Sequence, residues 1–516
     1  MPGILSQEDR GIPGTHPEFL NFRIRGASLE SLDLPNDARI SCMKRARKLI
    51  FAILLVVGAL AGVAVTAQAP VHIVIAHTND IHGQLQPRNG AGGMAEVATV
   101  IRSLSPDLIL DAGDMFTGTF INDEFKGLPM IQAMNKIGYT SGTIGNHEFD
   151  YGQQALRMRL KDAKFPVLSA NLETPISEIK KYTVVTVKGI RFGIIGVTTE
   201  ETATTTHPKN LDGVNILDAV KSLGQVLPEV RNKSDFIIVT AHLNDDEEKR
   251  VANAFPEIRL IVGGHNHGAL GPILVGQTLI AKTGNSGRFV GRVDLQFEEK
   301  KLTDIKGQLI PVMNVTATPE ISKIVGLYAS KVARKMNEVI GEATADLPTS
   351  NNSESPLGNL IADAYREKGK TQIGLQNVAG IRSRIVKGPV MWGEVFEVLP
   401  FQNTLVTLKL TGVQLKKTLN VGLLAVSGLR VHLDLKMPAG QRLVSMTLPD
   451  GTPIDDTALY SITTNDFVVA GGDAFSEVGK GIEIKDSGIL LRDVFVDYIK
   501  TRRTLSPALD GRVTVN

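Results

Sequence analysis

Short, uncharged runs rich in Val, Ile and Leu recur between residues 71 and about 300 and alternate with stretches of helical spacing. Continuous apolar runs of this kind are typical of strands that are buried on both faces of a sheet. The alternation therefore predicts an α/β fold with a layered sheet core. The predicted strands are Val71–Ala76, Leu108–Leu110, Phe192–Val197, Phe236–Val239 and Leu260–Val262, and the predicted helices include Met94–Leu104, Pro129–Ile137 and Asp218–Val230.

The chain has 516 residues, enough for two or more domains. An apolar stripe over residues 318–340 predicts an amphipathic helix, which we interpret as a linker over 316–340. It separates a first domain, 70–315, from a second domain, 341–516, that mixes helices with short strands. The stripe consists of Ile321, Ile324, Val325, Tyr328, Val332 and Met336.

The N-terminal segment is typical of a secretory signal peptide, expected over residues 43–69. Four basic residues between Lys44 and Lys48 precede an uncharged apolar run, and small residues follow. Cleavage after Ala67 is favoured, because cleavage after Ala69 would leave Pro70 at the new N-terminus. We expect export to the periplasm or the outside, and an uncleaved membrane anchor is the alternative. Translation is expected to begin at Met43, with residues 1–42 as an upstream extension; a real cytoplasmic tail is the alternative.

Charge and cysteine content exclude several classes of function. The formal net charge is +2, which gives no electrostatic basis for binding a nucleic acid polymer. The single cysteine, Cys42, excludes disulfides within the chain and zinc-thiolate sites. The composition is neither polar-biased nor heptad-like, so disorder and coiled coil are excluded for the chain as a whole.

Five short polar motifs each follow an apolar strand-like run. Ligands of open α/β sheets bind at the carboxyl ends of the strands, so these five loops are expected to converge. Most motifs are weak signals alone, but a run such as Gly145–Asp150 has no packing purpose. The motifs are Asp80-Ile81-His82, Gly113-Asp114, Gly145-Asn146-His147-Glu148-Phe149-Asp150, Ala241-His242 and Gly264-His265-Asn266-His267.

The chemistry of these motifs indicates metal binding. Carboxylate and amide oxygens together with imidazole nitrogens suit divalent zinc, manganese or iron. Seven such ligands are too many for one tetrahedral site, but they suit two ions about 3.5–4 Å apart that share a carboxylate. Such a pair lowers the pKa of a bound water and clamps a phosphoryl group for in-line attack.

This set of motifs resembles the calcineurin-like metallophosphoesterase superfamily. Within it, the runs His77–Gly83 and Gly145–Gly152 resemble the secreted 5′-nucleotidase family, and the resemblance covers nearly all of residues 72–516. It implies a four-layer αββα sandwich, followed by the linker helix and a smaller α/β nucleotide-binding domain. The activity it implies is hydrolysis of nucleoside 5′-monophosphates to nucleoside and phosphate.

The resemblance also implies a role for each polar residue of the motifs. Two divalent ions are expected, with zinc or manganese favoured. His147 is expected to contact the phosphate and Asp150 to orient His147, since a carboxylate keeps an imidazolium protonated. One metal would be bound by Asp80, His82 and His267, the other by Asn146, His242 and His265, with Asp114 as the bridge.

The second domain carries four further matches, in the runs 357–364, 377–383, 399–401 and 465–473. They imply that Phe401 and Phe467 sandwich the base, that Asp473 holds ribose hydroxyls, and that Asn377 and Arg382 line the pocket. Without these motifs, both phenylalanines would be expected in the core.

Two departures from the family pattern affect the nucleotide pocket. No Lys or Arg occurs from Gly341 to Tyr365, although the family usually has an arginine aligned near Asn351. Val378 and Ala379 stand where glycines are usual. Neither change touches the predicted metal site.

Two alternatives to a nucleoside monophosphatase remain open. One is another hydrolase of the same superfamily, acting on nucleotides more broadly, on nucleotide sugars, on cyclic nucleotides or in sulfur oxidation. The other is a catalytically silent nucleotide-binding protein. The complete second domain favours nucleotides, and the full ligand set favours catalysis. The oligomeric state is not indicated.

Overall fold

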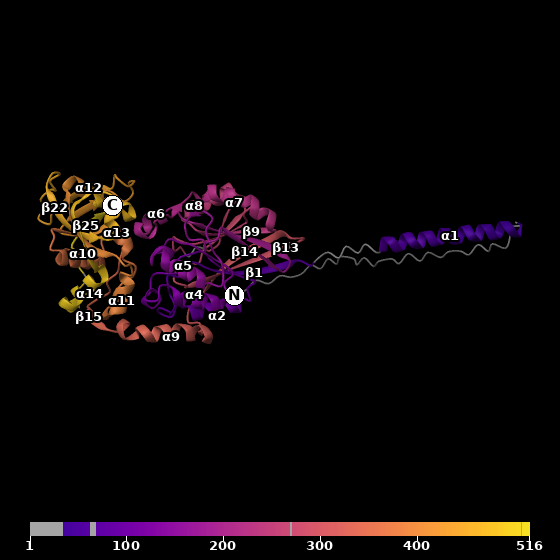
Figure 1. The fold of residues 1–516 in the computed structure, drawn as a ribbon, viewed down its shortest axis with the longest axis horizontal. Coiled ribbons are helices and arrows are strands. Elements are labelled where there is room, and N and C mark those ends of the chain that lie inside the picture. The colour runs from indigo at the N-terminus through magenta and orange to yellow at the C-terminus, as the bar shows by residue number, and fades with distance from the viewer. Residues whose placement is uncertain (1–34, 62–68, 269–270, 507) are drawn as a thin grey trace, which may run out of the picture. The chain divides into compact units, whose positions relative to one another are not determined.

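A computed structural model describes residues 35–61, 69–268, 271–506 and 508–516 (Figure 1). The chain divides into two units, Met1–Gln68 and Ala69–Asn516. The described part of the first unit contains the helix α1, Asn36–Ala61. No described helix has both the length and the apolar character that a membrane crossing requires. Residues 1–34 and the predicted cleavage region, Val65 to Gln68, lie outside the described residues, so the signal peptide stays a prediction.

The second unit begins with a domain of two main sheets, in which each predicted strand and helix is confirmed to within a few residues. One sheet has the strand order β14-β13-β1-β2, and the other has the order β11-β12-β10-β9-β7-β6. The bounds are β1 Val71–Thr78, β2 Leu108–Asp111, β6 Tyr182–Val187, β7 Ile190–Thr198, β9 Phe236–His242, β10 Leu260–Gly263, β11 Ile273–Val275, β12 Thr278–Ala281, β13 Phe289–Glu298 and β14 Lys301–Pro311.

Four layers follow from how these strands are buried. In β7 and β9, Ile194 and Ile238 pack between the two sheets. Their neighbours Ile195 and Val239 pack on the opposite face, against α7 (Ala219–Lys233) and α8 (Asp245–Ala254). The helices α2 (Met94–Ser103) and α4 (Leu128–Ile137) cover the other sheet, so the helices flank the strands on both sides (Figure 1). Consecutive residues thus serve different apolar layers, which explains the continuous apolar runs. The αββα sandwich is confirmed.

The strand directions place the motifs at the carboxyl ends of the strands, on one side of each sheet. β1 and β2 pair in parallel. In the other sheet, β7, β9, β10 and β12 are neighbours in that order and are all parallel to one another. Both sheets are nevertheless mixed, because β13 is antiparallel to β1 and β6 is antiparallel to β7. One motif differs from expectation: Gly145 follows β3, Gly142–Thr143, which forms a separate two-stranded sheet with β4, Val167–Leu168.

The predicted linker helix is α9, Pro319–Met336, and its buried residues belong to the predicted stripe. The second domain contains a five-stranded sheet of order β19-β16-β22-β18-β23, with β16 Ile373–Asn377, β18 Thr404–Thr411, β19 Leu424–Ser427, β22 Leu459–Asn465 and β23 Ile482–Leu490. Helices α10 Pro356–Gly369, α11 Trp392–Val398, α12 Gly412–Leu419, α13 Asp466–Val469 and α14 Leu491–Arg502 accompany it. The predicted fold class is therefore confirmed, whereas the exact domain boundaries stay predictions.

The remaining α-helices and strands of the second unit lie between these elements or after them. They are α3 Phe120–Asp123, α5 Gln153–Asp162, α6 Thr202–Thr205, β5 Leu172–Glu173, β8 Asn215–Ile216, β15 Val339–Ala343, β17 Gly388–Met391, β20 Arg430–Leu433, β21 Leu443–Thr447, β24 Thr504–Leu505 and β25 Val513–Val515.

Candidate active site

The loops that follow β1, β2, β3, β9 and β10 converge, as the motifs predicted. Two groups of acidic and histidine side chains have ligand atoms within 4.8 Å of one another. Asp114 belongs to both groups, so its carboxylate stands where a bridge between two ions would stand. The first group is Asp80, His82, Asp114 and His267, and the second is Asp114, His242 and His265.

In the first group, nitrogen and oxygen atoms face one another across a short gap. His82 Nε2 lies 2.8 Å from His267 Nε2. His82 Nε2 also lies 3.8 Å from Asp114 Oδ2, and His267 Nε2 lies 3.6 Å from Asp80 Oδ1. These convergent donor atoms are arranged as ligands around a cation.

The second group gains an amide oxygen from Asn146. His242 Nε2 lies 3.1 Å from Asp114 Oδ2 and 3.2 Å from Asn146 Oδ1. The structure thus brings together all seven predicted ligands. They include Asn146, whose motif follows only the two-residue strand β3.

The backbone at this site is strained. Asp80, His82, Asp114, His265 and His267 have φ values of 50°, 50°, 56°, 75° and 57°. Residues with a Cβ rarely adopt this left-handed conformation, which costs of order 1–3 kcal/mol each and clusters at functional sites. The loops therefore hold these side chains in place at the expense of local stability.

Asp80 and Asp114 are buried, with 0% and 1% of each residue exposed. Burial raises the pKa of Asp80 to about 6. Burial also opposes ionisation of Asp114, but His242 and His147 outweigh it and hold the pKa of that carboxyl well below its usual range. Buried anions of this kind are stabilised by a metal cation.

The imidazoles of His82 and His267 complement these anions. Burial lowers the pKa of His82 well below its usual value, and the neighbouring His267 lowers it further. Burial, together with Arg382, lowers the pKa of His267 to about 3. Neutral imidazoles keep a lone pair for a metal, so the donor set fits a dinuclear site for divalent cations.

Glu148 supports the site structurally and was not predicted, although it lies inside a predicted motif. Its buried carboxylate accepts hydrogen bonds from the backbone N–H groups of Gly145 (2.6 Å), Asp114 (3.0 Å) and Met115 (2.8 Å). It therefore fixes the Asp114 loop against the loop that carries Asn146 and His147.

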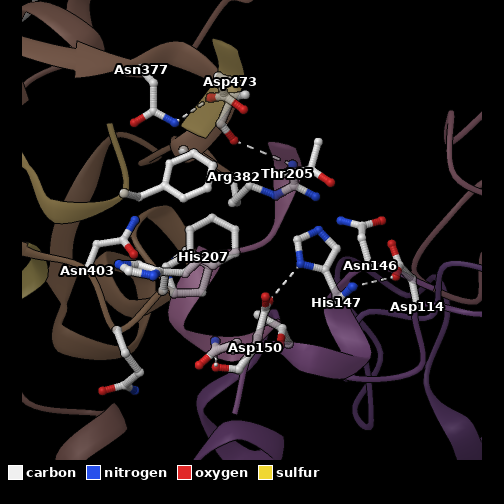
Figure 2. A pocket seen from close by; sticks show the side chains of 18 of the residues that line it. Asp114, Asn146, His147, Asp150, Thr205, His207, Asn377, Arg382, Asn403 and Asp473 are labelled. Carbon is white, nitrogen blue, oxygen red and sulfur yellow. Dashed lines mark hydrogen bonds and ion pairs between the residues drawn. The ribbon is translucent and has the colours of Figure 1, made fainter. Parts of the chain in front are cut away.

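His147 and Asp150 form the predicted pair. His147 Nδ1 lies 2.7 Å from Asp150 Oδ2, and the backbone N–H of His147 donates to Asp114 Oδ1 at 3.0 Å (Figure 2). Burial opposes protonation of His147, but the charges of Asp150 and Asp114 outweigh it and raise its pKa. The geometry favours an imidazolium whose Nε2 is left to face a ligand.

One cavity joins this region to the second domain (Figure 2). Asn377 Nδ2 donates to Asp473 Oδ2 at 2.7 Å, and Asn377 Oδ1 accepts from Asn465 and Gln376, both at 3.0 Å. The amide of Asn377 is thereby fixed in orientation. The cavity is lined by Asp114, Asn146, His147, Asp150, His265, His267, Asn377, Arg382, Phe401, Phe467 and Asp473, among others.

The two phenylalanines of this cavity differ. Phe401 is partly exposed and stacks on His147, with ring centroids 5.7 Å apart and planes inclined by 15°. The guanidinium carbon of Arg382 lies 5.9 Å from the ring centre of Phe401. Phe467 is only 7% exposed and belongs to the second domain's core. A Cβ on Gly472 would lie 2.4 Å from the Phe467 ring, so the glycine permits close packing on it.

Known proteins match both halves of this site. Residues 73–269 match the family described as calcineurin-like phosphoesterase, and residues 332–480 match the 5′-nucleotidase C-terminal domain. The crystal structure of a 5′-nucleotidase precursor from Thermus thermophilus is 33% identical, with a TM-score of 0.81, and the match covers 86% of this chain and 99% of that one. The chain belongs to the 5′-nucleotidase family. This confirms the resemblance that the motifs indicated.

Other relatives are similar at lower identity. A 5′-nucleotidase of Vibrio cholerae is 28% identical, and the match covers 83% of this chain and 90% of the relative. A trifunctional nucleotide phosphoesterase protein of Bacillus subtilis is 29% identical over 86% of this chain. The chain spans only 35% of that relative's length, and 40% of the length of an endonuclease from the same organism.

One loop of this 5′-nucleotidase family member contributes cavity residues that were not predicted. His207 and Lys209, which follow α6, line the cavity beside the second domain. His207 Nε2 and Lys209 Nζ lie 3.2 Å and 3.5 Å from Asp466 Oδ2, next to Phe467. No motif marks this loop, because its position depends on contact between domains.

Proposed function

We propose that this protein removes phosphate from nucleoside 5′-monophosphates and releases nucleoside and phosphate. One observation carries the proposal: the same cavity is lined by candidate metal ligands, such as Asp114 and His265, and by the candidate nucleoside residues Phe401 and Asp473. A nucleoside held by Phe401 and Asp473 has its 5′-phosphate directed toward the metal ligands. Family membership supports this assignment.

The predicted ligands would hold the two metal ions. Asp80, His82 and His267 would hold one ion; Asn146, His242 and His265 would hold the other, with Asp114 shared. Zinc or manganese fits this mixture of nitrogen and oxygen donors. When bound, such a pair supplies Lewis-acid activation of the phosphoryl group and of a water nucleophile.

His147 stabilises the charge that develops on the phosphoryl oxygens. Its Nδ1 is held by Asp150, so Nε2–H is available to donate a hydrogen bond toward the phosphate. A fixed donor of this kind stabilises the transition state, because it needs no reorganisation during the reaction. Asp150 orients the ring and keeps it protonated.

The second domain binds the nucleoside. The base stacks between Phe401 and Phe467, which exploits the π face that every base presents. Asp473, with Asn377 fixed beside it, accepts hydrogen bonds from the ribose hydroxyls, and Arg382 borders the phosphate side of the cavity. Binding energy from the base then positions the phosphate for attack.

A substrate panel tests this proposal. We would measure phosphate release from nucleoside 5′-monophosphates, nucleoside diphosphates, nucleotide sugars, cyclic nucleotides and an aryl phosphate, with Zn²⁺ or Mn²⁺ added. The proposal expects the highest kcat/KM with the 5′-monophosphates. Nucleotide binding without any hydrolysis would establish the silent binding protein instead.

A broader nucleotide or nucleotide-sugar phosphoesterase is the second candidate, and a second cavity favours it. This cavity of about 860 Å³ also borders His147 and His267 and is lined by Arg288 and Arg384. It opens beside the reaction centre and has room for a further anionic group on the substrate. It also contains Asn351, the position without the usual arginine. A higher kcat/KM for diphosphate-linked substrates would favour this candidate.

The export of the protein is part of the proposal. Basic residues before an apolar run support a cleaved signal over residues 43–69. N-terminal sequencing of exported protein should begin near Gln68 or Pro70. Any peptide from residues 1–42 in the secreted material would contradict both the cleavage and the start at Met43.

A further inference from the structure

His265 differs from the other candidate ligands in what holds its ring. Its Nε2 lies 2.8 Å from the carboxylate oxygen Oε2 of Glu201. Glu201 is outside every predicted motif and lies just after β7, at the N-cap of α6. It therefore belongs to a third strand end at the same sheet edge, beside β9 and β10.

The second oxygen of Glu201 is also occupied. Oε1 accepts a hydrogen bond from Asn244 Nδ2 at 2.8 Å. Asn244 follows His242 by two residues, and its own Oδ1 caps α8 by accepting from the backbone N–H of Glu247. The carboxylate is thus fixed between a helix cap and the ring of His265, although 48% of its side chain is exposed.

The other rings show why this contact matters. His242 Nδ1 faces the carbonyl of Ala112 at 2.9 Å, and His82 Nδ1 faces the carbonyl of Thr117 at 3.2 Å. Each ring therefore points its remaining nitrogen, Nε2, at the metal group. The hydrogen bond that one nitrogen makes selects the tautomer and frees the other nitrogen for a metal.

We propose that Glu201 is a positioning residue for the second metal. It accepts the Nε2–H of His265, so that Nδ1 keeps its lone pair for the ion and the ring cannot rotate away. The proposal rests on the two-metal site of the proposed function. The carboxylate of Glu201 would thus fix the ring of His265 as backbone carbonyls fix the rings of His242 and His82. Of these three contacts, the one made by Glu201 can be removed by a side-chain substitution.

Glu200 provides a matched control. It carries the same charge one residue earlier, but its closest ionic contact is Arg250 Nη2, 3.8 Å from Oε1. Removing either carboxylate changes the local field by one charge. Only the Glu201 variant also removes the acceptor for His265, so the pair separates a specific contact from general electrostatics.

The experiment measures binding of Mn²⁺ alone to the purified full chain by equilibrium dialysis. It also follows the histidine tautomers by ¹⁵N NMR. Glu201→Ala should weaken the second Mn²⁺ by about 10–100-fold and leave the first unchanged, and the Nε2–H tautomer of one histidine should lose its dominance. Glu201→Gln, which keeps a neutral acceptor, should restore part of both. Glu200→Ala should match the wild type, and melting curves establish that each variant is folded.

Three results would overturn the proposal. The first is wild-type Mn²⁺ affinity and tautomer in folded Glu201→Ala. The second is an equal loss in Glu200→Ala, which would indicate a field effect. The third is a complete loss of the second Mn²⁺ in both the Ala and the Gln variants, which would make Glu201 a ligand. A wild-type chain that binds fewer than two Mn²⁺ would instead contradict the proposed function itself.

Discussion

The metal centre and the nucleoside pocket share one cavity but are built in opposite ways. The metal centre consists of buried polar side chains on strained loops, and Asp80 and Asp114 contribute no apolar packing. The nucleoside pocket instead uses a residue of the hydrophobic core, because Phe467 is buried against Gly472 while it lines the cavity. The strained loops of the metal centre therefore lower the stability of the fold, whereas the buried Phe467 of the nucleoside pocket raises it.

This difference determines what substitutions can reveal. At the metal centre, a substitution should abolish hydrolysis of every phosphate ester, because the ions act on the phosphoryl group itself. In the nucleoside pocket, the effect of a substitution on binding must be separated from its effect on packing. Substitutions in both regions can test this contrast, from the largest expected effect to the smallest.

The largest effect is expected for Asp114→Ala. This change removes the carboxylate that both ligand groups share, so the protein should lose both ions or their coupling. Phosphate release should fall to background for a nucleoside monophosphate and for an aryl phosphate alike. Metal analysis and both assays measure this. Retention of both ions, or of activity on the aryl phosphate, would contradict the shared role of Asp114.

His147→Ala should have the next largest effect. We expect kcat to decrease by roughly 10²–10⁴, the range for one positioned acid or oxyanion donor. Both metals should remain bound, because the ring is paired with Asp150 and is not needed as a ligand. Asp150→Asn is the matched control and should give a smaller loss. If metal analysis found the His147→Ala site empty, His147 would be a ligand and its assigned role would be wrong.

The predictability of the two regions also differs. The strands and the metal-site motifs could be predicted because a buried strand that ends in Asp, Asn or His has few structural explanations. The positions of His207 and Glu201 could not, since each depends on contacts between segments far apart in the sequence. The hairpin of β13 and β14 was not among the predicted strands, because its residues alternate between more and less buried positions and so form no continuous apolar run.

For the phenylalanines, the structure separates two outcomes that the sequence treated alike. Phe401→Ala and Phe467→Ala should each weaken kcat/KM for a nucleoside monophosphate by about 1–3 kcal/mol. Phe467→Ala should also lower the stability by roughly 3–5 kcal/mol, because it empties a buried position. Phe401→Ala should lower it much less, since that ring is partly exposed.

An aryl phosphate serves as the control substrate for both variants, because it has no nucleoside to bind. Assays well below each melting temperature should show little change for it. Calorimetric melting separates the stability effect. Equal losses on the two substrates in folded Phe401→Ala would mean that the ring acts through its stacking on His147 and not through the base.

The smallest effect is expected for Asp473→Ala, and it tests the ribose contact alone. Asp473 is held by Asn377 and adopts a left-handed backbone conformation, with φ of 51°, so the loop presents its carboxylate at a fixed position. A lost hydrogen bond of this kind costs about 0.5–1.5 kcal/mol. We therefore expect a corresponding decrease in kcat/KM for a ribonucleoside monophosphate and a smaller decrease for the 2′-deoxy substrate, which already lacks one hydroxyl. The change also leaves the buried Nδ2 of Asn377 without its acceptor, so the melting temperature should fall as well, and both substrates are assayed well below it. A penalty of equal size on both substrates would show that Asp473 supports Asn377 and leaves the ribose hydroxyls to other residues.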